Sequence, residues 1–295
     1  MRIKRIKQKK RVRFDLKAGD SKFVINTEPE DPKLPGLFVF CGSRGSGKTY
    51  ACVAMVAHFE RMGYITRTFL ICPTKQSNDI FNNLKTLDQT KDVCDKPECN
   101  KTALANIMNE VKKDWAKYED DKLYMKTYKK YSKKPGLFVP VDAEKILASR
   151  DFSTPVQPKK PAHMVIADDL QGTNMYSNAR NDLMAHVAIK SRHIPISVAY
   201  LVQSWNGLPR VIRLNATQFM VYKTGDKKQL KQIYEHFGTT LDEPTFNRLY
   251  TYAVAQPHGF LYIDTEPKKE SMRFRSGFNE FLDPTESTDA LLGSL

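Results

Sequence analysis

The sequence predicts an α/β fold in which a mostly parallel sheet has helices on both faces and carries a helical insertion. Three observations predict it. Short apolar runs of strand length alternate with longer helical patterns, as in a series of β-α-β units. The first apolar run leads directly into a glycine-rich loop at residues 42–49. A charged, helix-permissive stretch then interrupts the alternation, which resumes near His163.

Residues 1–35 are expected to form a basic N-terminal arm and an irregular lead-in. Residues 1–13 hold eight Lys or Arg and no acid. Such an arm suits contact with phosphate backbones, a nuclear import signal or a solvated tail, and the sequence does not decide among them. Pro29, Pro32 and Pro35 favour irregular structure in the lead-in.

Residues 42–49 read Gly-Ser-Arg-Gly-Ser-Gly-Lys-Thr, a complete phosphate-binding loop, or Walker A motif. The loop lies between an expected strand at 37–41 and an expected helix at 49–62, which is the context that the motif requires. Its backbone N–H groups and the positive helix end would hold the phosphates of ATP. Lys48 would reach the β- and γ-phosphates, and Thr49 would ligate Mg²⁺. The expected ATP-binding residues are Gly42, Ser43, Arg44, Gly45, Ser46, Gly47, Lys48 and Thr49.

The core is expected to span residues 36–283. After the phosphate loop, a short buried strand at 67–72 stops at Pro73, and a helix at about 78–87 would close a second β-α unit. Residues 88–160 read as an insertion, because 101–132 are charged and helix-permissive and several prolines follow. The aromatic residues of this insertion suit either packing of the arm or a DNA-facing surface.

Beyond the insertion the apolar periodicity returns. Strands are expected at 164–167, 196–202, 216–222 and 260–264, and helices at 178–191, 227–237 and 245–252. Residues 284–295 are polar and are expected to form a flexible tail.

The apolar run at 164–167 ends in Asp168-Asp169, which has the form of a Walker B strand. Such a strand would bring its carboxylates to the sheet edge beside the phosphate loop. Asp168 would hold the Mg²⁺ ion, and Asp169 would polarise the attacking water. Lys48 and Asp168 are 120 positions apart, enough for a whole β-α unit and the insertion. That order resembles the additional-strand class of P-loop NTPases, in which the next strand ends in a polar sensor, here Gln203.

The composition is strongly basic, with a net charge of +14 and a pI of about 9.4. An anionic partner such as nucleic acid is therefore plausible, although an ordinary basic protein has the same signature. Cys41, Cys52 and Cys72 lie in apolar segments and are expected in the core. No apolar stretch reaches the length of a membrane span, so no membrane partner is expected. Ser43 and Ser46 belong to the phosphate loop, which leaves no Ser–His hydrolase arrangement.

Two further segments carry a family resemblance. They are Ser191-Arg192-His193 followed by the strand ending in Gln203, and the run Pro209-Arg210-Val211-Ile212-Arg213-Leu214-Asn215. Together with the Walker pair, they resemble the poxvirus-type genome-packaging ATPases of large eukaryotic DNA viruses and virophages, in the FtsK/HerA superfamily. The likeness covers about residues 36–75 and 160–265 and leaves out the basic arm and the insertion.

The resemblance implies an ATP-driven homo-oligomeric ring that moves double-stranded DNA, without reading its sequence, into a preformed capsid. It implies portal or vertex proteins as partners, and a location in the virion or in the infected host cell, in a cytoplasmic factory or the nucleus. An arginine of one subunit would reach the γ-phosphate in the next, and Arg192, Arg210 and Arg213 are the candidates. The family often has glutamate where this chain has Asp169, so the carboxylate expected to activate water is on a shorter side chain here.

Three other functions remain open from the sequence alone. A phage assembly or secretion ATPase of the zonula-occludens-toxin type shares the fold but usually carries a membrane segment. A DNA-binding structural protein with a vestigial nucleotide site is disfavoured, because Lys48, Thr49 and Asp168 are all present. A helicase would need further motifs that the chain does not show.

Overall fold

The structure is a computed structural model of the 295-residue chain. It describes residues 23–75, 78–95, 101–131, 139–150, 157–171, 176, 183–190, 194–237 and 241–285. The basic arm at 1–13, Arg192 and most of the expected tail lie outside the described residues.

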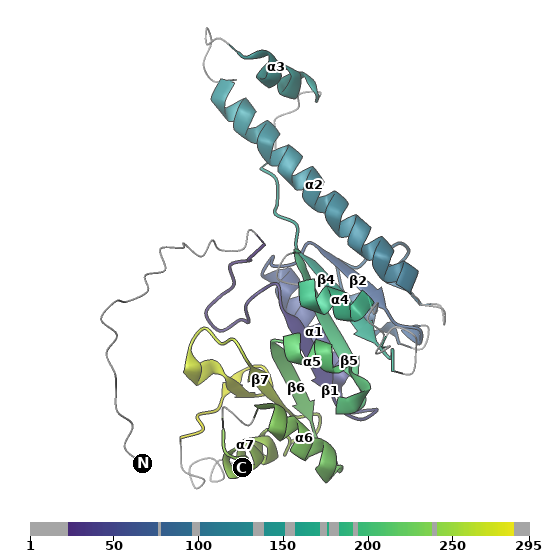
Figure 1. The fold of residues 1–295 in the computed structure, drawn as a ribbon, viewed down its shortest axis with the longest axis vertical. Helices are drawn as coiled ribbons and strands as arrows, with labels where there is room; N and C mark the ends of the chain where they lie inside the picture. The colour runs from purple at the N-terminus through teal and green to yellow at the C-terminus, as the bar shows by residue number, and fades with distance from the viewer. Residues whose placement is uncertain are drawn as a thin grey trace, which may run out of the picture.

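One nine-stranded sheet forms the centre of the molecule (Figure 1). Its order is β3-β2-β4-β5-β1-β6-β7-β8-β9; the pairings from β3 to β6 are parallel and those from β6 to β9 are antiparallel. The expected mostly parallel sheet is confirmed. The strands are β1 (Leu37–Cys41), β2 (Arg67–Ile71), β3 (Val93–Cys94), β4 (His163–Asp168), β5 (Ile196–Val202), β6 (Gln218–Tyr222), β7 (Phe260–Asp264), β8 (Phe274–Ser276) and β9 (Glu280–Phe281).

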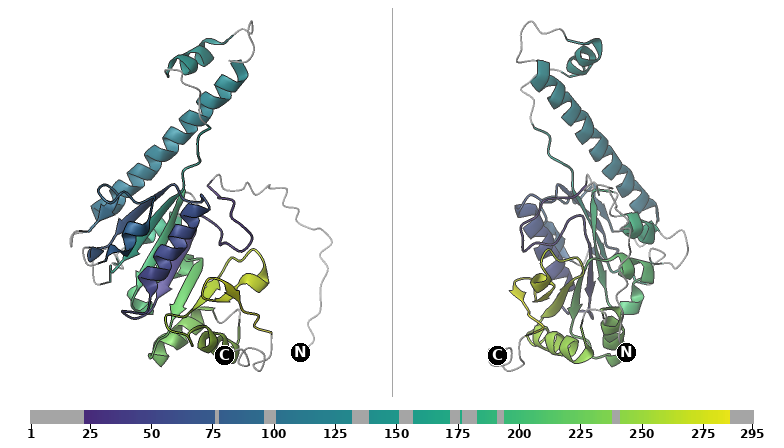
Figure 2. Two further views of the ribbon diagram at one scale, coloured as in Figure 1. Left: turned by 180° about the vertical axis from the view of Figure 1, so that it is seen from behind. Right: turned by 60° about the vertical axis from the view of Figure 1, so that its left-hand side comes forward.

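Helices cover both faces of the sheet, as expected (Figure 2). Helix α1 (Lys48–Arg61) packs on one face. The opposite face carries α4 (Leu183–Lys190), α5 (Arg210–Asn215), α6 (Lys227–Phe237), α7 (Glu243–Ala253) and the first part of α2 (Lys101–Tyr131). Because the central strands are buried on both sides, they read as continuous apolar runs.

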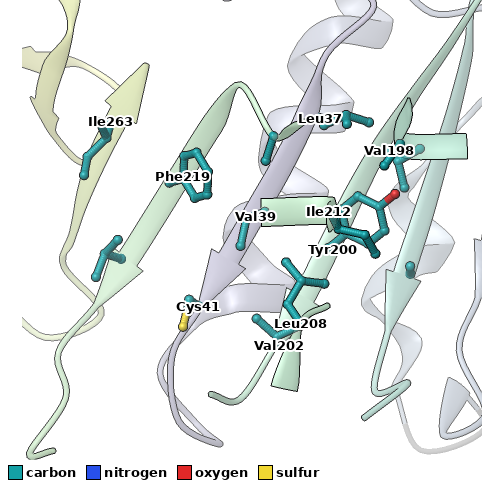
Figure 3. Close-up of a cluster of buried hydrophobic side chains, with 14 of the residues drawn as sticks. Leu37, Val39, Cys41, Val198, Tyr200, Val202, Leu208, Ile212, Phe219 and Ile263 are labelled. Carbon is teal, nitrogen blue, oxygen red and sulfur yellow. The ribbon is translucent and has the colours of Figure 1, made fainter. Parts of the chain in front are cut away.

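Alternate residues of each central strand enter different layers. Leu37, Val39 and Cys41 of β1 face the same layer as Val198, Tyr200 and Val202 of β5 (Figure 3). Leu208 and Ile212, on the segment that ends in α5, close this layer. Burying such side chains contributes roughly 1.5–3 kcal/mol each, so this layer holds the segment after β5 firmly against the sheet.

Helix α2 extends beyond the sheet, with α3 (Val141–Ala148) near its far end (Figure 1). Its first part belongs to the core, since Leu104, Ile107 and Val111 are buried in the α4–α7 layer. Farther along, Arg150 pairs with Asp120 and Asp121, and its guanidinium lies over the Tyr124 ring at 4.8 Å. These contacts favour a packing role for Tyr124.

Several sequence-based expectations need correction. The helix predicted at 78–87 is wrong: a short 3₁₀ helix, Asp79–Asn83, is followed by a turn at residues 85–86 and a β-bridge at Leu87. Glu60 of α1 accepts hydrogen bonds from the backbone N–H groups of Lys85 and Thr86, which fixes that non-helical path. Strand β3 lies inside the expected insertion and pairs with β2, so the segment that leaves the sheet starts later than residue 88. Of the helix expected at 178–191, the described residues form α4, Leu183–Lys190.

Cys41, Cys52 and Cys72 are buried free thiols, as expected for core residues. Cys94, at the end of β3, is disulfide-bonded. No helix in the described part of the chain is both long and apolar enough to cross a membrane.

Candidate nucleotide site

The phosphate loop connects β1 to α1 at the carboxyl edge of the parallel strands. Gly45 and Gly47 have φ of 77° and 96°, in the left-handed region that favours glycine. Gly42 approaches β6 so closely that an added Cβ would lie 2.6 Å from the Tyr222 Cβ. The glycines of the motif are thus required by backbone conformation or by close packing.

Lys48 is 8% exposed, and its Nζ donates to the carbonyl oxygens of Gly42 and Ser43 at 2.6 and 2.8 Å. Burial lowers the pKa of Lys48, and the nearby Asp168 carboxylate opposes that shift. The Ser46 Oγ is buried with no hydrogen-bond partner among the described residues. A buried ammonium and an unpaired hydroxyl in one loop suit the binding of an anionic group such as a phosphate.

Thr49 and Asp168 meet although they are 119 positions apart in the chain. The Thr49 Oγ1 donates to the Asp168 Oδ2 at 3.1 Å. Asp168 ends β4, and β5 lies between β4 and β1, which confirms the additional-strand order. Burial raises the pKa of Asp168, and the hydrogen bond from Thr49 opposes the rise. A hydroxyl and a carboxylate side by side fit Mg²⁺, which favours few protein oxygens together with water and phosphate.

Asp169 and Gln203 also come together at this edge. Asp169 has φ of 56°, an uncommon backbone angle for a residue other than glycine. This turn directs its carboxylate toward Gln203, whose Nε2 donates to the Asp169 Oδ1 at 3.3 Å. Gln203 follows directly on β5 and is exposed. A carboxylate and an amide in contact can together orient a water molecule.

The candidate arginines differ in their surroundings. Arg210 is exposed at the first position of α5. The Arg213 guanidinium lies 5.2 Å from the centre of the Trp205 ring, and burial lowers the pKa of Arg213. Its Nε is buried and has no hydrogen-bond partner within the described ranges. Arg210 is therefore free to reach another molecule, whereas Arg213 is part of the packing in its own chain.

A cavity of about 430 Å³ lies beside the phosphate loop. One side is Ser43–Ser46, and the other is the end of β6 with the loop at residues 254–259. His258 has φ of 63°, and a Cβ added to Gly47 would lie 3.1 Å from the His258 Cβ. No sequence motif indicated that this loop lies beside the phosphate loop. The turn-forming Pro257-His258-Gly259 before β7 was the available signal, but it does not show which part of the chain the turn meets.

No protein-family model matches the chain, and no curated protein matches it. Among solved structures, it resembles the DNA-packaging ATPase of Sulfolobus turreted icosahedral virus, with 14% identity, a TM-score of 0.50, and coverage of 84% of this chain and 97% of that one. A genome-packaging NTPase of Sulfolobus turreted icosahedral virus 2, in complex with AMP, gives 13% identity, a TM-score of 0.47, and coverage of 84% and 98%.

A third solved structure, EssC ATPases 2 and 3 from Geobacillus thermodenitrificans, gives 12% identity and a TM-score of 0.42, covering 88% of this chain and 42% of that one. At such identities the likeness concerns the fold. The fold is that of P-loop ATPases, as the sequence predicted.

Proposed function

We propose that this protein is an ATPase motor that translocates double-stranded DNA into a preformed capsid. The observation that carries the proposal is the assembly of both Walker motifs and a polar sensor at one sheet edge. Lys48 lies in the phosphate loop, Thr49 contacts Asp168, and Asp169 contacts Gln203. The fold likeness to a viral DNA-packaging ATPase supports the same conclusion.

Each of these side chains has a distinct role in the proposed hydrolysis. Lys48 would exchange its carbonyl partners for phosphate oxygens and stabilise the charge that builds up on the transferred group. Thr49 and Asp168 would hold Mg²⁺, which supplies further charge neutralisation when bound. Asp169 would orient the attacking water and accept its proton, and Gln203 would hold that water from the neighbouring strand end. The ribose and base of ATP would occupy the cavity between Ser43–Ser46 and residues 254–259.

Translocation requires that several copies act together. We assign the trans arginine to Arg210 in a homo-oligomeric ring, because it is exposed at the start of α5. Portal or vertex proteins of the capsid would be the other protein partners, and the protein would act in the virion or the infected cell. The net charge of +14 and the eight basic residues at 1–13 support sequence-independent binding to the DNA backbone.

The test combines ATP hydrolysis, DNA binding and mass in solution. We expect ATPase activity that duplex DNA stimulates, and a ring-sized assembly with a non-hydrolysable ATP analogue. Deleting residues 1–13 removes eight positive charges, so it should lower duplex affinity and flatten its salt dependence. A protein with no duplex affinity at low salt, or with DNA-independent activity as a monomer, would contradict the motor.

A further inference from the structure

Gln171 joins the two strand ends that carry the candidate hydrolytic pair, Asp169 and Gln203. It lies three residues beyond the end of β4. Its Oε1 accepts a hydrogen bond of 2.6 Å from the backbone N–H of Gln203. Its Nε2 donates to the Ser204 Oγ at 3.1 Å. One side chain from the Walker B loop therefore binds two consecutive residues of the sensor loop.

These bonds hold the main chain from which the sensor side chain extends. The ladder between β4 and β5 ends with Asp168 opposite Leu201, so beyond it no strand pairing holds Gln203. At that point the Gln171 carboxamide accepts the hydrogen bond from the Gln203 backbone N–H and holds the main chain in place. The Gln203 side chain then reaches Asp169, 3.3 Å away. Without Gln171, no strand pairing would hold the Gln203 main chain in that position.

Gly207 provides the space for this arrangement. A Cβ at Gly207 would overlap the Gln171 Nε2 and lie 2.5 Å from its Cδ. Gly207 has no left-handed backbone angle, so the need for glycine comes from this contact. The same loop contains Trp205, which is 1% exposed and packs under the guanidinium of Arg213. The sensor is thereby connected to the helix that presents Arg210.

We propose that Gln171 is a positioning residue for hydrolysis: it holds the Gln203 backbone so that the sensor amide faces Asp169, and Gly207 leaves room for it. The proposal rests on the proposed ATPase activity. Gln171 touches neither nucleotide nor attacking water in this role, and acts only through Gln203. It should therefore affect turnover rather than nucleotide affinity.

The test compares Gln171→Leu with Gly207→Ala. The first removes both hydrogen bonds, and the second keeps the carboxamide but displaces it. We expect kcat to fall about tenfold in each, as for the loss of one well-placed hydrogen bond, with KM for ATP changed less than about twofold. Asn206→Ala is the matched control, because Asn206 is an exposed amide on the same loop that bonds to Gln232 instead. It should keep the wild-type kcat.

A double variant separates positioning from general damage. If Gln171 acts through Gln203, then Gln171→Leu should add little to the loss already caused by Gln203→Ala. Hydrogen exchange at the backbone N–H of Gln203 should be about tenfold faster in Gln171→Leu than in the wild type, and unchanged in Asn206→Ala. Wild-type kcat in Gln171→Leu, additive losses in the double variant, or unchanged exchange would each overturn the proposal. A wild-type protein that hydrolyses no ATP would instead contradict the proposed function, and the exchange comparison would still test the contact.

Discussion

The Thr49 hydroxyl donates a hydrogen bond to the Asp168 carboxylate across 3.1 Å, joining the first turn of α1 to the end of β4. Asp168 is 9% exposed, and Lys48 lies close enough to lower its pKa, although burial raises it more. A buried carboxylate with so few partners is costly in the nucleotide-free protein. A bound cation would stabilise it.

Binding of Mg²⁺ with ADP should weaken as the pH falls, sooner than it would for an ordinary aspartate. The metal needs ionised Asp168, and burial raises the pKa of this carboxyl. The stability of the ligand-free protein depends on pH in the opposite direction. Because the folded protein binds this proton more tightly than the unfolded chain, the contribution of Asp168 to the free energy of unfolding decreases as pH rises through the raised pKa.

Calorimetric titration of Mg²⁺ with ADP at several pH values, alongside thermal melting without ligand, measures both effects. Asp168→Asn should bind Mg²⁺ with ADP weakly, and this affinity should change little with pH in the acidic range. Identical pH profiles for the wild type and Asp168→Asn would contradict the metal role. Removing Mg²⁺ with EDTA should stop hydrolysis in the wild type.

Lys48→Ala should reduce kcat for ATP by at least about a hundredfold, because it removes a preorganised positive charge from the phosphate loop. Its thermal melting should show a folded protein. Lys227→Ala, which replaces an exposed lysine on α6, is the matched control and should hydrolyse ATP normally. Wild-type turnover in Lys48→Ala would rule out this loop as the site of hydrolysis.

Replacing the two arginines of α5 should have different consequences. Arg210→Ala should lose hydrolysis while keeping nucleotide binding and stability, because Arg210 is exposed. Arg213→Ala should lower the free energy of unfolding by about 1 kcal/mol, since it removes the guanidinium from the Trp205 ring. Denaturant unfolding and ATPase assays on both variants distinguish these outcomes.

Mixing Arg210→Ala with Lys48→Ala subunits should restore part of the activity. An interface between an intact phosphate loop and an intact arginine can form only in the mixture. Full activity of Arg210→Ala as a monomer at high dilution would exclude a trans arginine at this position.

Arg67→Leu should destabilise the protein by about 3 kcal/mol, the cost of leaving a buried carboxylate unpaired. The Arg67 guanidinium contacts both oxygens of the buried Asp92, at 2.7 and 2.9 Å, and Asp114 of α2 at 3.3 Å. Denaturant unfolding measures the loss. Lys113→Ala breaks only an exposed pair with Glu110 and should cost less than about 0.5 kcal/mol. Equal stability of both variants would show that Arg67 does not anchor α2.

The parts of the site that the sequence predicted are those that depend on local signals. The phosphate loop has a contiguous motif, because consecutive N–H groups must surround one ligand. Asp168 and Gln203 were predicted because each follows an apolar run, and parallel strands end at the same edge. The helix at 78–87 was mispredicted, since the Glu60 carboxylate that stabilises the non-helical chain comes from another element.

The sequence by itself determined the alternation of strands and helices, the phosphate loop and the acidic pair at the end of the fourth strand, because these depend on periodicity and contiguous spacing. Only the tertiary structure decided that the Gln171 side chain lies against Gly207 and that His258 packs against Gly47. It also distinguished the exposed Arg210 from Arg213, which packs on Trp205, whereas the sequence made both equal candidates for the trans arginine. Each of these depends on contacts between segments far apart in the chain, and packing in three dimensions creates contacts that no local pattern encodes.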